Sequence, residues 1–257
     1  MRLLKRLVKG FYMSLGMFSA IPLPNYPWDD VCMDLVLPCF PLVGLLLGTI
    51  WWGLAELLAL SGIHLILAAA LLTVTPFLLT GFLHLDGYMD TSDAVFSRRP
   101  LEEKIRILKD PQIGAFSVIM LANLFVLQFA AVYVVLDLGR SFIPVIFLTV
   151  ISRCCVSLSL LSLKVMPQSG YAKLFRQNVR TQHRVFIIAL AVLTAATSYI
   201  LAGFIGLAVV MSVIIGFAAA MTYSYKEFKG VSGDLAGFSL IISELFGLLA
   251  LGVVQWF

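Results

Sequence analysis

Long apolar runs separated by short connections are the feature that most restricts how this chain can fold. Of its 257 residues, 61% are apolar and only 12% are charged, whereas an ordinary soluble domain has about 25% charged residues. A helix needs about 20 mostly apolar residues to cross a hydrocarbon core. Seven runs approach or exceed that length, at residues 36–60, 63–83, 113–136, 142–163, 185–202, 204–223 and 235–257. The sequence therefore predicts an all-α, polytopic integral membrane bundle of about seven transmembrane helices.

The basic residues divide the connections between these runs into two alternating sorts. Sixteen of the 18 lysines and arginines lie in the N-terminal residues and in segments 84–112, 164–184 and 224–234. The connections near Gly62, Gly139 and Gly203 carry few charges or none. By the positive-inside rule, this pattern predicts a multi-pass protein of the cell membrane with a cytoplasmic N-terminus and its C-terminus outside. The formal charge of +4 suits anionic head groups or a phosphorylated ligand, and nothing indicates nucleic acid.

The N-terminal segment, residues 1–34, is predicted to be an interfacial or re-entrant helix that stays in the mature protein. Its basic start and the apolar run Phe11–Pro24 imitate a signal peptide, but prolines follow the run and no small-residue cleavage pattern does. The run is also short for a membrane span. Residues 1–257 are therefore predicted to form one membrane-embedded domain.

The strongest chemical signal is an acidic and basic segment, residues 84–112, at the end of an apolar run. Asp86, Asp90 and Asp93 are spaced four and three apart, which places them on one face of a helix. Neighbouring carboxylates about 6 Å apart repel by roughly 2–3 kcal/mol at an effective dielectric near 20. Oxygen ligands suit Mg²⁺, with Mn²⁺ as an alternative. The segment thus predicts a divalent metal at the cytoplasmic boundary, and the small Gly87 would let a phosphate or metal approach the backbone.

Two readings of the charges in this segment remain open. Arg98, Arg99 and Lys109 can grip the phosphates of a substrate. Alternatively, the two arginines simply neutralise the three aspartates on a solvated face. The emergence of the carboxylates from an apolar run favours the metal site, because a carboxylate at a membrane boundary is costly unless compensated.

Other polar residues extend the candidate site. The basic cytoplasmic loop 164–184 contains Lys173 and Arg176 and no acid, so it predicts either phosphate capture or a plain positive-inside loop. Asp234 begins the last apolar run, where an aspartate is either a helix cap or part of the site. His84 is a candidate general base or hydrogen-bond donor to a phosphate. Three ionisable residues lie inside predicted spans, where they are functional candidates unless they pair with one another: Glu56, Arg153 and Glu244.

The pattern resembles the cobalamin synthase family, the adenosylcobinamide-GDP ribazoletransferases. The resemblance rests on His84-Leu85-Asp86-Gly87-x-x-Asp90-Thr91-x-Asp93, on Ile107-Leu108-Lys109-Asp110-x-x-Ile113-Gly114-Ala115-Phe116, and on Gly230-Val231-Ser232-Gly233-Asp234-x-x-Gly237. Weaker similarities lie in residues 18–24 and 40–44. These segments follow the family order and extend over nearly the whole chain.

The resemblance implies a late step of adenosylcobalamin assembly. α-Ribazole, or its 5′-phosphate, would attack the cobinamide-linked phosphate of adenosylcobinamide-GDP and release GMP, with Mg²⁺ as cofactor. It adds Asp234 as a fourth metal ligand or as a group that orients the nucleophile. It also implies contact with other cobalamin-assembly enzymes. The remaining residues expected to contact substrate or phosphate are Gly87, Asp110, Gly114, Arg153, Gly233 and Glu244.

Two other classes of function remain as alternatives. A different membrane transferase, acting on a pyrophosphate-linked or prenyl substrate, would also use spaced aspartates, but this chain has one aspartate-rich motif and a lone Asp234. A transporter would use Glu56, Arg153 and Glu244 as pathway residues and would show internal sequence symmetry, which the sequence lacks.

Overall fold

The protein is all-helical, as predicted, in a computed structural model that describes residues 2–24, 28–167, 169–176 and 179–253. The first half comprises α1 (Arg2–Phe18), the 3₁₀ helix η1 (Asp30–Leu35), α2 (Val36–Ser61), α3 (Leu65–Leu79), α4 (Leu83–Phe96) and α5 (Leu101–Ile107). The second half comprises α6 (Ala115–Asp137), α7 (Pro144–Ser162), α8 (Gly170–Leu174), α9 (Thr181–Phe228) and α10 (Gly233–Val253). Apart from one isolated bridge, these described residues form no β-structure.

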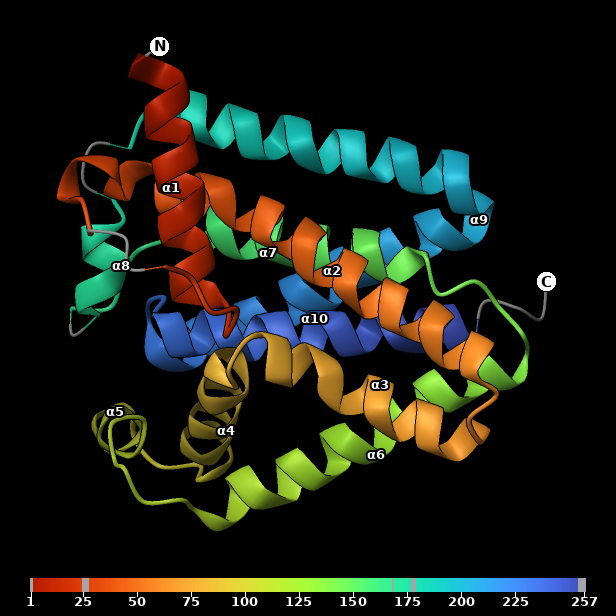
Figure 1. Ribbon diagram of the computed structural model, residues 1–257. Coiled ribbons are helices and arrows are strands. Elements are labelled where there is room, and N and C mark those ends of the chain that lie inside the picture. The colour runs from red at the N-terminus through yellow and green to blue at the C-terminus, as the bar shows by residue number, and fades with distance from the viewer. Residues whose placement is uncertain (1, 25–27, 168, 177–178, 254–257) are drawn as a thin grey trace.

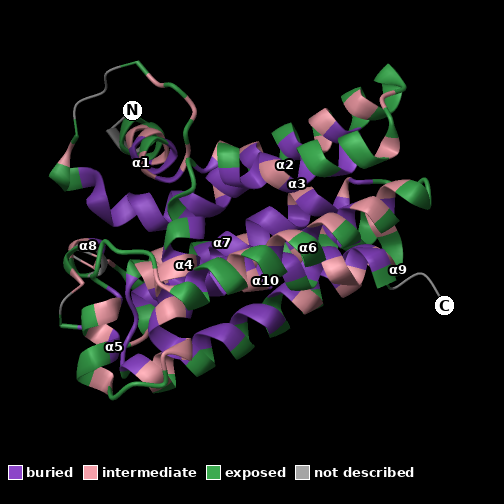
Figure 2. Ribbon diagram, turned by 90° about the horizontal axis from the view of Figure 1, so that it is seen from below, coloured by how far each residue is buried: buried purple, intermediate pink, exposed green. Residues whose placement is uncertain are grey.

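The long helices run roughly side by side, with α7 and α10 in the interior (Figure 1). Helix α10 packs against α9, α7, α4 and α6, and α7 packs against α2 and α9. Buried residues gather on these two helices (Figure 2), and Val145, Leu148 and Leu248 are fully buried. Apolar residues lie on all sides of α7 and α10, a pattern typical of interior or membrane helices. The burial of these two helices follows from that composition.

Five helices in the described residues are long and apolar enough to cross a membrane, and a sixth span results if α3 and α4 form one broken span. Helix α9 counts once among the five, although its 48 residues contain a break at Gly203. The predicted runs 185–202 and 204–223 are the two arms of α9. The predicted number of about seven is reached when those arms count separately and the bent pair counts once. The last predicted run ended at Phe257, and its residues 254–257 lie outside the described ones.

The break in α9 reverses the chain. Gly203 has φ 60° and ψ −145°, a conformation that only glycine adopts readily. A Cβ atom on Gly206 would lie 2.6 Å from the Ser198 hydroxyl, although eight residues of continuous helix would separate the two by about 12 Å. The short uncharged connection that the sequence predicted at Gly203 is therefore a tight turn between two helical arms.

A second break separates α3 from α4, which are bent by 91°. Gly81 has a left-handed φ of 59°. The Phe82 amide donates to the Phe77 carbonyl at 2.9 Å and the Gly81 amide donates to that of Leu78 at 3.1 Å, which is a Schellman ending. The Ala20 amide satisfies the Leu79 carbonyl at 2.9 Å. Helix α3 thus ends four residues before the predicted boundary at residue 83, and α4 turns across the bundle.

The N-terminal helix α1 is steeply inclined to the long helices, at the same end of the bundle as α4, α5 and α8 (Figure 1). Ion pairs join it to the segment before α2, between Arg6 and Asp34 at 3.1 Å and between Lys9 and Asp29. Leu4 and Val8 are exposed on its outer face. These features suit the predicted interfacial segment 1–34, whose location in the membrane stays a prediction, and residues 1 and 25–27 lie outside the described chain.

Two connections at this end are joined by backbone hydrogen bonds. The Met166 amide donates to the Val231 carbonyl at 3.0 Å, and the Val231 amide donates to the Lys164 carbonyl at 2.9 Å, which forms the parallel bridge between Val165 and Val231. The basic loop 164–184 therefore starts beside the turn that precedes Asp234. Residues 168, 177 and 178 of this loop are not described.

Candidate active site

Helix α4 crosses the start of α10 at two glycines. A Cβ atom on Gly87 would lie 2.9 Å from both Cα and the carbonyl oxygen of Asp234, and one on Gly237 would lie 3.2 Å from the His84 carbonyl oxygen. Any larger residue would force the two backbones apart, as at small-residue crossings of membrane helices generally. The α10 backbone occupies the space that a Gly87 side chain would fill, and contact of Gly87 with a phosphate or metal stays a prediction.

This crossing brings carboxylates from two helices together. Asp86 is exposed, and Asp90 and Asp234 are half-buried. Asp90 is repelled by Asp86, Asp234 and Asp93, and Asp234 is repelled by Asp86. In the part of the chain that the structure describes, none of these four carboxylates forms an ion pair with a lysine or arginine. Within the described residues, the four carboxylates of this cluster therefore have no ion-pair partner.

Asp93 differs from the other three because a helix end holds it. Its Oδ1 accepts a hydrogen bond from the Phe116 amide at 3.2 Å, at the start of α6. Its carboxylate also lies against the Cα of Gly114, where any side chain would clash with it. An anion at a helix N-terminus is stabilised by the free amides and the helix dipole. The absence of a side chain at Gly114 therefore lets the Asp93 carboxylate accept a hydrogen bond from a free amide at the α6 N-terminus.

Asp234 is not the cap of α10. The hydroxyl of Ser232 accepts a hydrogen bond from the Leu235 amide at 3.3 Å, and the Ser232 carbonyl accepts from the Ala236 amide at 3.1 Å. Ser232 is thus the N-cap. The capping alternative for Asp234 fails, and its carboxylate remains available to the cluster.

The donor chemistry of the cluster suits a divalent cation. In the described residues no three of these side chains already converge as ligands, so binding requires them to rotate. All donors are carboxylate oxygens, which Mg²⁺ and Mn²⁺ favour. Asp93 already accepts from the Phe116 amide, whereas in the described part of the chain no amide of another element donates to Asp86, Asp90 or Asp234, and Asp234 accepts only a long bond of 3.5 Å from the Ser232 hydroxyl. The first three therefore fit a metal better than Asp93 does.

The basic residues of segment 84–112 do not neutralise the aspartates. Arg98, Arg99 and Lys109 are exposed, and neither arginine forms an ion pair within the described chain. Arg98 has a left-handed φ of 54°, a conformation that costs energy for a residue other than glycine. The neutralising alternative therefore finds no support, and the three cations remain free to meet an anionic ligand. Asp110 is also exposed and accepts from the Gln112 amide at 3.0 Å, which forms a local turn.

His84 lies away from the carboxylate face. Its side chain is buried against Phe18 and Phe40, with ring centroids 6.2 and 5.7 Å away. Its Nε2 atom has no hydrogen-bond partner among the described residues. Two residues along a helix turn the side chain through about 200°, so His84 and Asp86 point in different directions. In the structure His84 packs against aromatic side chains, and its role as a general base or as a hydrogen-bond donor to phosphate stays a prediction.

The predicted phosphate ligands of loop 164–184 bind backbone carbonyls. Arg176 donates to the Leu160 carbonyl at 2.7 Å and also to that of Leu163 at the end of α7. Lys173 is exposed and donates to the Pro167 carbonyl at 2.6 Å. Arg176 thereby satisfies free carbonyls at a helix C-terminus. Substrate binding by this loop stays a prediction, with Lys173 the more accessible of the two side chains.

Arg153 and Glu244 pair with each other inside the bundle. Ser152 donates to Glu244 at 2.9 Å, and the Arg153 guanidinium lies 5.6 Å from the Phe40 ring centroid. Mutual pairing was the predicted alternative to a functional role for these two residues, and the structure shows that pairing. Their contact with substrate stays a prediction. Glu56 is exposed and accepts from the Trp52 indole at 2.9 Å.

The sequence analysis gave no role to two residues that shape the site. Gly237 allows α10 to approach α4, and Ser232 caps α10 in place of Asp234. The signal for Gly237 was present as the small-xxx-small spacing from Gly233. Gly233 itself is exposed, with open space around it. The signal for Ser232 was a serine two residues before Asp234.

The fold and this cluster define a polytopic membrane protein with an acidic site at one end of its bundle. Residues 10–252 match the model of the cobalamin-5-phosphate synthase family. The chain is 38% identical to an adenosylcobinamide-GDP ribazoletransferase of Clostridium botulinum over 96% of this chain and 98% of that one. It is 36% identical to the protein of that name from Clostridium perfringens, over 98% and 100%. The protein belongs to the cobalamin-5-phosphate synthase family, and it is an enzyme of the transferase class. No solved structure matches it significantly.

Proposed function

We propose that the protein joins α-ribazole, or its 5′-phosphate, to adenosylcobinamide-GDP, giving adenosylcobalamin or its 5′-phosphate and GMP. The observation that carries this proposal is the cluster of Asp86, Asp90 and Asp234, which two helices bring together and to which no lysine or arginine of the described chain is paired. Family membership and the names of the relatives supply the substrate class. The other transferase and transporter readings have no such support.

In this proposal Asp86, Asp90 and Asp234 hold one Mg²⁺ or Mn²⁺. When bound, such a cation neutralises charge on the pyrophosphate and polarises the attacked phosphorus. The protein provides the fixed crossing of α4 and α10, which sets the spacing of the three carboxylates. Asp93 positions α4 against α6 through the Phe116 amide. This assignment differs from the sequence analysis, which gave Asp93 the same role as Asp86 and Asp90.

The transfer needs one bond made and one bond broken. A ribose hydroxyl oxygen of α-ribazole attacks the cobinamide-linked phosphorus, and the bond from that phosphorus to the bridging oxygen breaks, so that GMP leaves. The hydroxyl proton passes to a carboxylate of the cluster, since His84 is buried on another side of α4. The exposed Arg98, Arg99 and Lys109 hold the phosphates of the nucleotide.

We also infer that the acidic end of the bundle and the N-terminus face the cytoplasm. The basic connections lie at this end, as the positive-inside rule requires, and α1, α4, α5 and α8 lie there together (Figure 1). A charged nucleotide-linked substrate then meets the site without crossing the hydrocarbon core.

The test is a product assay with purified protein, adenosylcobinamide-GDP, α-ribazole and Mg²⁺. We expect equal amounts of GMP and adenosylcobalamin, and no product when a chelator removes the cation. Running the reaction with α-ribazole 5′-phosphate identifies the preferred acceptor. Transfer onto a polyprenyl acceptor with no GMP from adenosylcobinamide-GDP would overturn the proposal in favour of another membrane transferase.

A further inference from the structure

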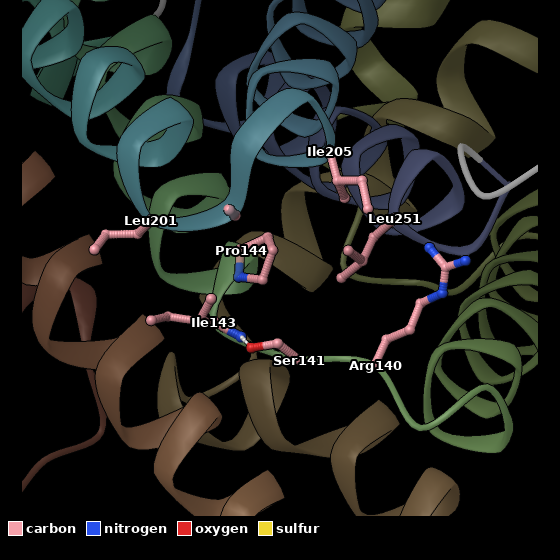
Figure 3. Close-up of a pocket in the computed structure, with 8 residues that line it drawn as sticks. Arg140, Ser141, Ile143, Pro144, Leu201, Ile205 and Leu251 are labelled. Atoms are coloured by element: carbon pink, nitrogen blue, oxygen red, sulfur yellow. Dashed lines mark hydrogen bonds between the residues drawn. The ribbon is translucent and has the colours of Figure 1, made fainter. Parts of the chain in front are cut away.

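A pocket of about 240 Å³ lies at the opposite end of the bundle from the carboxylates. It lies between the α6–α7 connection, the Gly203 reversal of α9 and the end of α10. Leu251 in its wall is seventeen residues from Asp234 along α10, or about 25 Å, so the pocket is separate from the proposed active site. Figure 3 shows the lining side chains, which are Arg140, Ser141, Ile143, Pro144, Leu201, Ala202, Ile205 and Leu251.

The connection that carries Arg140 is held firmly. The Arg140 amide donates to the Val135 carbonyl at 3.2 Å. Two residues later Phe142 is 2% exposed and packs edge-on against Trp51, with ring centroids 5.5 Å apart. The Ser141 hydroxyl accepts from the Ile143 amide at 3.3 Å and keeps its own proton for another acceptor. The polar end of the pocket is thus formed before any ligand arrives.

Among the described residues of this lining, Arg140 is the one charged residue and none is a carboxylate. The two buried cations of the described chain each have an acidic partner, since Arg153 pairs with Glu244 and Lys104 with Glu227, and the half-buried Arg176 donates to the Leu160 and Leu163 carbonyls. The guanidinium of Arg140 forms no such pair within the described residues, even with Asp137 three residues before it. A half-buried cation over apolar walls attracts an anion with an apolar body.

The surroundings of the pocket are apolar and exposed. Ile200, Leu201 and Phe204 at the Gly203 reversal are 77%, 59% and 71% exposed, and Leu138 is 52% exposed beside Arg140. In a membrane protein, exposed apolar side chains of this kind face acyl chains. The pocket therefore opens where the phosphate level and the hydrocarbon of one leaflet meet.

We propose that this pocket binds an anionic phospholipid of the leaflet opposite the active site. Its phosphate accepts hydrogen bonds from the Arg140 guanidinium. Its first chain carbons occupy the apolar walls, and the rest of the chain lies along Leu201 and Phe204. A zwitterionic lipid suits the pocket less well, because its ammonium group finds no carboxylate in the lining.

The experiment uses the full chain purified in detergent and titrated with phosphatidylglycerol, with binding followed by native mass spectrometry. We expect phosphatidylglycerol to bind more tightly than phosphatidylcholine, and Arg140→Gln to weaken its binding about tenfold, the effect of losing one charge-assisted hydrogen bond. Ala202→Leu keeps the charge but fills the apolar wall, so it should weaken binding as well. Arg140→Lys should retain most of the affinity.

The matched control is Arg106→Gln, which removes an exposed arginine at the other end of the bundle and should leave lipid binding unchanged. Release of GMP by each variant shows that it is folded, and this activity is independent of the lipid site. Unchanged phosphatidylglycerol binding in both Arg140→Gln and Ala202→Leu would overturn the proposal. Displacement of the lipid by millimolar inorganic phosphate would mean a small-anion site. Binding only after removal of residues 254–257 would mean that the chain itself occupies the pocket; either result refutes the lipid site.

Discussion

Asp234 and Glu244 lie on the same helix, α10, and have opposite surroundings. Glu244 is buried and paired with Arg153, with Ser152 donating a further hydrogen bond at 2.9 Å. Asp234 is half-buried and has other carboxylates, Asp86 and Asp90, as its charged neighbours. Ten residues of α10 therefore separate a carboxylate with an oppositely charged partner from one that accepts a hydrogen bond from Ser232 but has only carboxylates as charged neighbours.

The difference indicates which charged residues stabilise the fold and which are free to bind a ligand. A buried ion pair with extra hydrogen bonds can persist without any ligand, although its desolvation offsets much of its attraction. A group of repelling carboxylates at an open end lowers stability, so it is useful only if something binds there. We therefore propose that Glu244 and Arg153 stabilise the bundle and that Asp86, Asp90 and Asp234 take part in the reaction.

The largest expected effect on stability comes from breaking the buried pair. Glu244→Gln leaves the Arg153 charge without a partner inside the bundle, and the free energy of unfolding should fall by about 3–5 kcal/mol. Thermal unfolding in detergent measures this loss. The double variant Arg153→Gln/Glu244→Gln should recover a large part of it. A stable Glu244→Gln protein that has lost turnover would instead place this pair in substrate binding.

The next effect is on catalysis. Asp86→Asn keeps the shape of the side chain but removes a charge from the cluster, so kcat/KM for GMP release should fall by about 10²–10³, or about 3–4 kcal/mol. Unfolding should change little, and extra Mg²⁺ should restore part of the activity. Glu102→Gln, an exposed change on α5, is the control. Full activity of Asp86→Asn in metal-free buffer would refute the metal site.

A smaller effect should follow from separating the two helices without touching a charge. Gly87→Ala introduces a Cβ that meets the Asp234 backbone at 2.9 Å, and overpacking of this kind costs about 1–3 kcal/mol. Activity should fall because the carboxylates move apart. Gly53→Ala, where a Cβ meets nothing within 4 Å, should keep full stability and activity. Equal behaviour of the two variants would show that the crossing does not set the site.

The smallest effect should distinguish Asp93 from its neighbours. Asn at position 93 can still accept the hydrogen bond from the Phe116 amide, so Asp93→Asn should lower kcat/KM only a few-fold. Asp93→Ala loses that contact and should cost about 1 kcal/mol of stability. Unfolding and GMP release, measured on both variants, give these values. A loss in Asp93→Asn as large as that in Asp86→Asn would return Asp93 to the metal ligands.

Much of the fold could be predicted because each span carries its own signal. The apolar runs, the basic connections and Gly203 depend on residues that are neighbours in sequence, and the structure places helices or turns at each of them. The early end of α3 was missed because the apolar run continues to Leu83 while the backbone has already turned at Gly81 and Phe82. The hydropathy of a segment carries no information on backbone dihedral angles, so it could not locate this turn.

The candidate site was predictable in its chemistry but not in its partners. The spacing of Asp86 and Asp90 indicates a shared helical face, and that spacing holds in α4. Asp234 could be attached to them only through the resemblance, because its contact with Gly87 joins positions far apart in the chain. The hydrogen bond from the Phe116 amide at the start of α6 to Asp93 could not be predicted for the same reason.

The short helix α3 has a consequence for the bilayer around it. Its 15 residues span about 22 Å, whereas a hydrocarbon core is about 30 Å thick. We therefore expect the membrane beside α3 to thin toward the acidic end, at a modest cost for each ångström of hydrophobic mismatch. Reconstitution in lipids of decreasing chain length should relieve that mismatch and raise the thermal stability, whereas a constant stability would mean that neighbouring helices shield α3. The stability of the protein should therefore depend on the thickness of the surrounding bilayer.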